Sequence, residues 1–165
     1  TIDAILDSTE MPNNKNEIYQ DDKKVPDIAV DATKEVFLEQ NESTKEEVSY
    51  EKKINLLKFY AMKYSKEHDS ERTYLCMMKL IKNGEFDIPM EYSIQLYRQN
   101  QFKTSLHFFE IMSKFNHPIA QFFIGRMKFY GQGCETDHEE SYSIMKRLST
   151  KGIDKATEFL EQHFK

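Results

Sequence analysis

Short segments with apolar residues at helical spacing follow one another from Val48 to the end of the chain, and brief polar breaks separate them. One segment begins at Ser70, an expected N-cap, and stops at Asn83-Gly84. None shows the sustained apolar–polar alternation of a strand. Helices joined by short breaks pack as antiparallel hairpins. The sequence therefore predicts an all-α fold, a short α-solenoid of about three helical hairpins over residues 48–165.

Residues 1–47 differ in composition from the rest of the chain. They hold 13 Asp and Glu against 5 Lys, no glycine, and a single Phe and Tyr. Such a segment buries too little apolar surface to offset the loss of chain entropy. We expect a mostly irregular acidic leader, disordered or bound to a partner. The remaining residues, 48–165, carry a small positive balance of +3.

The run "GRMKFYGQGCETD" places three glycines within nine residues. A phosphate-binding loop would need Gly-Lys-Ser/Thr after a strand, and neither is present. Helix packing and helix termination explain the run instead. Gly125 permits close approach of a neighbouring helix, and Gly131 and Gly133 permit left-handed turns. Asp137 is expected to cap the next helix, with Glu140 completing a capping box. The glycines are therefore expected to shape helix corners and to touch no ligand.

A repeat is visible in the same region. Ala120 and Ala156 lie 36 residues apart, and each is followed four residues later by a large aliphatic residue, Ile124 or Leu160. Helix pairs that recur at such a period are typical of α-solenoids.

These positions together resemble the Sel1-like repeat family, a relative of the tetratricopeptide (TPR) repeats. The matching structural positions are Ala120, Ile124, Gly125, Gly131, Gly133, Asp137, Ser141, Gly152 and Ala156. Lys128 departs from the pattern at an aromatic position, and Leu148-Ser149 replace an alanine pair. The resemblance covers residues 118–160 best. It implies a scaffold or adaptor that acts through protein–protein interaction in complex assembly.

The segment 119–130 gives the candidate partner-binding residues. On a helical projection, Phe122 and Phe129 stand beside Arg126, apart from the main apolar sector. Aromatic and Arg side chains are enriched at binding hot spots, so these three are predicted to anchor a partner in a concave groove. Tyr92, Tyr97 and Arg98 would extend that surface. The alternative is burial against the preceding repeat. Gln121, Gly125 and Lys128 form a separate polar or small strip.

Neither a catalytic group nor a metal site can be assigned. No nucleophile–base pair, no His-Glu-x-x-His and no Cys-x-x-Cys occurs, and Cys134 is expected to be a packed side chain. We therefore expect a protein that is not an enzyme, that uses no cofactor, and that binds a protein partner to assemble or regulate a complex. The alternative is an RNA-binding helical-repeat protein, possibly organellar, whose binding would weaken steeply with salt.

The location expected from the sequence is cytoplasmic, with mitochondrial as the alternative. Two cysteines form no disulfide framework, which fits a reducing compartment. The longest apolar runs are far shorter than the roughly 20 residues that a membrane-spanning helix needs, so no membrane span is expected.

Overall fold

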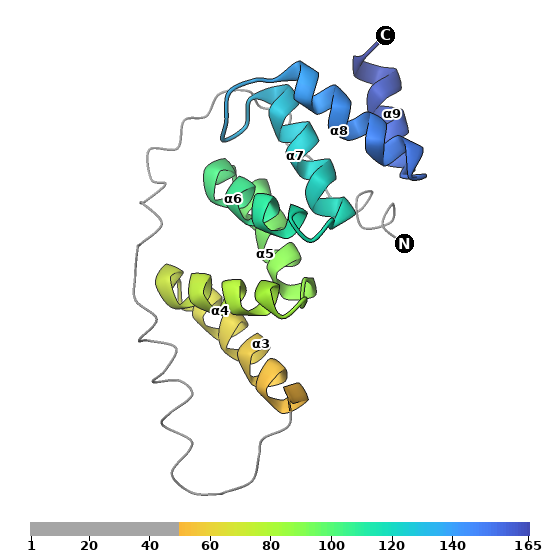
Figure 1. Ribbon diagram of the computed structural model, residues 1–165. Helices are drawn as coiled ribbons and strands as arrows, with labels where there is room; N and C mark the ends of the chain where they lie inside the picture. The colour runs from red at the N-terminus through yellow and green to blue at the C-terminus, as the bar shows by residue number, and fades with distance from the viewer. Residues whose placement is uncertain (1–49) are drawn as a thin grey trace, which may run out of the picture. The chain divides into compact units, whose positions relative to one another are not determined.

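A computed structural model describes residues 50–165, and the leader predicted for residues 1–47 lies outside them. Every regular element in the described range is a helix (Figure 1). The elements are α3 (Tyr50–Lys66), α4 (Ser70–Lys82), α5 (Asp87–Arg98), α6 (Phe102–Ser113), α7 (Pro118–Tyr130), α8 (His138–Thr150) and α9 (Asp154–His163). The predicted all-α class is confirmed for this part of the chain, and adjacent helices pack in the manner of helical repeats.

The described residues divide into two compact units, 50–89 and 90–165. In the first unit α3 packs on α4 (Figure 1). Their shared core consists of Ile54, Leu57, Ala61, Tyr64, Cys76, Met77, Leu80 and Ile81. Lys58 on α3 forms ion pairs with Glu85 at 2.8 Å and Asp87 at 3.1 Å. These pairs tie the segment that follows α4 back to α3.

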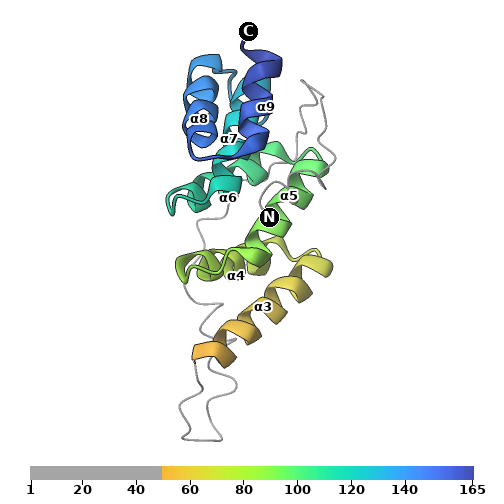
Figure 2. The same ribbon diagram turned by 90° about the vertical axis from the view of Figure 1, so that its right-hand side faces the viewer.

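The second unit contains most of α5 and all of α6–α9. The Ser105 hydroxyl of α6 donates to the Ser93 carbonyl of α5 at 3.0 Å, and both serines are buried. The Phe109 ring of α6 stacks on the Phe123 ring of α7 with 4.6 Å between centroids. Beyond these, α7, α8 and α9 lie side by side (Figure 2). The core of this unit is therefore built from successive helix pairs.

Several helix ends within residues 50–165 share one hydrogen-bond pattern. The backbone N–H after a left-handed residue donates to the carbonyl five residues earlier, the Schellman arrangement. The pairs are Asp69 to Tyr64, Glu85 to Leu80, Gln101 to Leu96, Gln132 to Met127 and Ile153 to Leu148, all at 2.9–3.1 Å. The left-handed residues are His68, Gly84, Asn100, Gly131 and Gly152. The glycine stops expected from the sequence are confirmed, and His68 and Asn100 play the same part.

The N-cap of α4 differs from the prediction. Asp69, not Ser70, is the cap, and its carboxylate accepts a hydrogen bond from the Arg72 backbone N–H at 3.0 Å. Ser70 is the first helical residue. Because the residue before it already carries a good capping oxygen, the helix begins one position earlier than expected.

Gly125 lies on the face of α7 that packs closely against α8. A Cβ built on it would come within 3.0 Å of the Met145 Cε atom and 3.1 Å of the Ile144 Cγ2 atom. Those distances are shorter than ordinary van der Waals contact. The predicted reason for a mid-helix glycine, close approach of a neighbouring helix, is therefore confirmed.

The α7–α8 loop has the expected backbone but only half of the expected capping box. Gly131 and Gly133 have φ values of 68° and 74°. The Asp137 carboxylate accepts from the Glu140 N–H at 2.9 Å, as predicted. The Glu140 carboxylate instead pairs with Lys128 at 2.9 Å, while the Asp137 N–H donates to the Lys128 carbonyl at 2.8 Å. One carbonyl and one side chain of α7 thus replace the second half of the box.

Candidate groove between helices α6, α7 and α8

Three of the predicted anchors are buried by the protein's own helices. Tyr97, Phe122 and Arg126 are 0%, 4% and 9% exposed. The Tyr97 hydroxyl donates to the Gln132 side-chain carbonyl at 2.8 Å and accepts from Arg126 Nε at 3.3 Å. The Arg126 guanidinium lies 4.9 Å from the centre of the Tyr130 ring. The structure corrects the prediction here, because these side chains bind one another inside the unit and present no open surface to a partner.

The other three predicted anchors are more accessible but are dispersed. Phe129 is half-buried and stacks on His138 with 4.5 Å between ring centroids. Tyr92 is half-buried with its ring edge-on to Phe108. Arg98 is exposed at the end of α5. The six residues therefore do not form the single concave surface that helical projection suggested.

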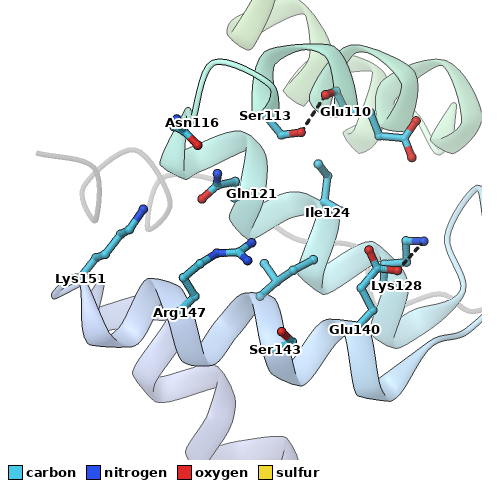
Figure 3. Close-up of a pocket in the computed structure, with 11 residues that line it drawn as sticks. Glu110, Ser113, Asn116, Gln121, Ile124, Lys128, Glu140, Ser143, Arg147 and Lys151 are labelled. Atoms are coloured by element: carbon cyan, nitrogen blue, oxygen red, sulfur yellow. Dashed lines mark hydrogen bonds and ion pairs between the residues drawn. The ribbon is translucent and has the colours of Figure 1, made fainter.

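A groove of about 600 Å³ lies along a different stripe of α7, between the end of α6, α7 and α8 (Figure 3). Helix α7 contributes Gln121, Ile124 and Lys128 to its lining. Two of these belong to the polar and small strip seen in the sequence. The third residue of that strip, Gly125, lets α8 approach α7. The polar and small strip in the sequence therefore marks the face of α7 that lines this groove.

Helix α8 and its C-cap residue form the opposite wall, from Glu140 to Lys151. At 1.5 Å per residue this wall is about 16 Å long. Ile124 and Ile144 supply buried apolar surface on the two walls. A cleft with these dimensions matches about five residues of extended peptide at roughly 3.3 Å each.

The two ends of the groove differ in charge. At one end Lys128 pairs with Glu140 at 2.9 Å, and this hydrogen bond is the main reason that the pKa of Lys128 is raised. Glu110, also at this end, makes no ion pair with any described residue. At the other end lie Arg147 and Lys151, and within residues 50–165 neither side chain has an ionic or hydrogen-bond partner.

Gln121 lies between these ends and is the most unusual residue of the groove. Its side chain is 8% exposed, and its Oε1 atom has no hydrogen-bond donor among the described residues. Figure 3 shows the amide directed into the space between the α6–α7 turn and the Arg147 side chain. An unsatisfied buried acceptor costs about 1–3 kcal/mol, so such groups in folded proteins call for an explanation.

Neither cysteine has the properties of a nucleophile. Burial raises the pKa of Cys76 to about 11. Burial also raises the pKa of Cys134, whose thiol lies 3.8 Å from the Met127 carbonyl oxygen. Within the part of the chain that the structure describes, His, Cys, Asp and Glu form no cluster able to hold a metal ion. None of the helices described is both long and apolar enough to cross a bilayer.

Comparison with protein-family models, with curated proteins and with solved structures finds no match to this chain. The resemblance to Sel1-like repeats therefore depends on the spacing of residues 118–160 alone and stays a prediction. What the structure adds is the geometry of that region: two helices brought together at Gly125, with an open polar groove beside the contact.

Proposed function

We propose that this protein is a non-catalytic adaptor that binds an extended segment of a partner protein in the groove between α6, α7 and α8, and so helps to assemble or regulate a complex. The observation that carries this proposal is the buried, unpartnered amide of Gln121 in the lining of an elongated cleft. A ligand that supplies a hydrogen-bond donor would satisfy it.

The composition of the groove supports a peptide over a compact small molecule. Apolar patches at Ile124 and Ile144 alternate with amide, hydroxyl and charged groups along about three turns of α8. Side chains and backbone amides of an extended peptide present the same alternation. Helical-repeat folds commonly offer such extended binding faces between neighbouring helices. We further propose that the adaptor is of the Sel1-like or TPR type, on the residue spacing of positions 118–160.

The test is a selection of peptides from a random displayed library against the full chain, followed by affinity measurement by fluorescence anisotropy. Ser143 lines the groove on α8, whereas Lys146 lies on the same helix outside it, and both are exposed. Ser143→Trp should fill the groove and weaken peptide binding by about tenfold or more, while Lys146→Trp should leave it unchanged.

Three results would overturn the proposal. One is that no peptide binds better than to an unrelated protein. Another is that the selected peptides bind Ser143→Trp as well as the unchanged chain. The last is that a single-stranded RNA oligonucleotide binds more tightly than any peptide, with a steep dependence on salt, which would favour the RNA-binding alternative.

A further inference from the structure

We propose that the groove recognises an acidic segment: a carboxylate of the partner pairs with Arg147 and Lys151, while a neighbouring peptide unit pairs with the Gln121 amide. This inference rests on the proposed function, because it names the ligand chemistry of the same groove.

The two cations define where the acidic group binds. Arg147 lies in the last turn of α8 and Lys151, four residues later, is the C-cap of that helix, so both side chains line the same side of its C-terminal end. Both are exposed, and neither has an ionic partner within residues 50–165. A guanidinium matches a carboxylate through two parallel hydrogen bonds, which makes Arg147 the stronger recognition group of the pair.

The Gln121 amide defines what must lie beside that carboxylate. Its Oε1 atom is an acceptor without a donor, and the side chain points toward the same end of the groove as Arg147 (Figure 3). A backbone peptide unit offers both an N–H donor and a carbonyl acceptor, so it can pair with both polar ends of a Gln side chain. A free carboxylate or inorganic anion would supply no donor.

The other end of the groove sets the direction of the ligand. Glu110 and the Lys128–Glu140 pair give that end a net negative charge, which opposes a second acidic group. Gln121 and Lys128 are two helical turns apart, about 10 Å along α7. The segment should therefore carry its acid near Arg147 and a neutral or basic residue about three positions away.

The selected peptides should accordingly be enriched in Asp or Glu at one position. Arg147→Gln combined with Lys151→Gln should weaken their binding by about tenfold or more, and Lys146→Gln should not. Reversal of both charges, Arg147→Glu with Lys151→Glu, should shift a repeated selection toward Lys and Arg at that position.

Gln121→Leu gives a second, independent readout. Leucine fills a similar volume without a polar atom, so the free protein should be as stable as before or more stable, while peptide binding weakens. A Gln121→Leu variant that is clearly less stable in thermal unfolding would show that the amide is satisfied inside the protein. That result would overturn the role given to Gln121 and leave the pairing of a carboxylate with Arg147 and Lys151 to be decided by the charge variants.

The outcomes separate this inference from the function on which it rests. One outcome is that Ser143→Trp abolishes peptide binding, while the peptides show no preference for acidic residues and still bind the Arg147→Gln and Lys151→Gln double variant. That outcome would overturn the proposal of an acidic ligand and leave the adaptor function standing. Failure of every peptide would overturn the adaptor function itself. If a phosphoserine peptide bound more than about tenfold better than the same peptide with Glu at that position, the recognised group would be a phosphoryl group and not a carboxylate.

Discussion

The backbone of Gly133 lies against the backbone of Phe102, so that a Cβ on the glycine would come within 2.7 Å of both the carbonyl carbon and the carbonyl oxygen of Phe102. The α7–α8 loop therefore touches the first turn of α6, far from it in sequence. The hydrogen bond from Tyr97 to Gln132 joins the same loop to α5. This loop positions α8, which forms one wall of the groove.

Gly133→Ala should destabilise the second unit more than Gly152→Ala does. Both glycines have positive φ, so each alanine costs about 1–2 kcal/mol in backbone strain. A Cβ at Gly152 meets no atom within 4 Å, whereas one at Gly133 meets rigid backbone, which adds roughly 1–3 kcal/mol. Urea unfolding of the two variants measures the difference. Equal free energies of unfolding would contradict the close contact with Phe102.

The packing at Gly125 predicts a steep dependence on side-chain size. Gly125→Ala should gain up to about 1 kcal/mol from the higher helix propensity of alanine. The new methyl group needs Met145 and Ile144 to shift by only tenths of an ångström, so the free energy of unfolding should change by less than about 1 kcal/mol. Gly125→Val should lose roughly 1–3 kcal/mol through overpacking. Thermal unfolding followed by circular dichroism tests both. A fully stable valine variant would mean that α7 and α8 are not in close contact.

The buried hydroxyl of Tyr97 should contribute measurably to stability. Tyr97→Phe removes the donor to Gln132 and the acceptor for Arg126, and the expected loss is about 1–3 kcal/mol. Tyr142→Phe, at an exposed tyrosine, serves as the matched control and should have little effect. Chemical denaturation of both variants makes the comparison. If the two losses were the same, the buried network would have no net stabilising role.

Stability should fall when the solution becomes acidic. Burial lowers the pKa of His117, and burial together with the positive Arg126 lowers the pKa of His163. A histidine with a lowered folded-state pKa holds fewer protons when folded than when unfolded. Protons therefore favour the unfolded state as pH drops below the ordinary value of 6.5, and the loss levels off below the folded-state pKa.

The measurement is the free energy of unfolding between about pH 7.5 and about pH 5.5. The double variant His117→Gln with His163→Gln should show a flatter profile than the unchanged chain. His68→Asn is the control, because His68 is exposed and asparagine tolerates its left-handed backbone. An unchanged slope in the double variant would assign the pH dependence to other groups.

The two thiols should differ in their rates of alkylation. Cys76 is buried with its pKa raised to about 11, while Cys134 is only half-buried. Iodoacetamide near neutral pH should modify Cys134 first and Cys76 only after unfolding, and both more slowly than a free thiol. Mass spectrometry of proteolytic peptides measures the alkylation of each cysteine. In the Cys134→Ala variant, any remaining alkylation comes from Cys76. Equal rates would contradict the burial of Cys76.

Much of the helical architecture could be predicted from local sequence, because its causes are local. Gly84, Gly131 and Gly152 end helices through their own backbone freedom, and Asp137 caps α8 through an oxygen three residues from its target. His68 carries no comparable signal, although it ends α3 in the same conformation. Histidine adopts left-handed backbone far less readily than glycine, so the turn around His68 determines its conformation.

The candidate site was harder to predict because it depends on which helix covers which face. Projection of α7 shows two apolar sectors but does not reveal that Phe159 of α9 covers Phe122 and Phe129. The polar strip of Gln121 and Lys128 was visible. That Arg147 lies across the groove from Gln121 follows from the rotation of α8 about its axis, which side-chain packing decides.

The repeated helix endings also bear on how the chain reaches its native state. Each of these bends is closed by a hydrogen bond spanning only five residues, for example from Glu85 to Leu80. Reversals of this kind depend on contacts between residues close in sequence, and helical chains rich in such contacts fold in about microseconds to milliseconds. The low sequence separation of these hydrogen bonds therefore favours rapid folding of the helix pairs.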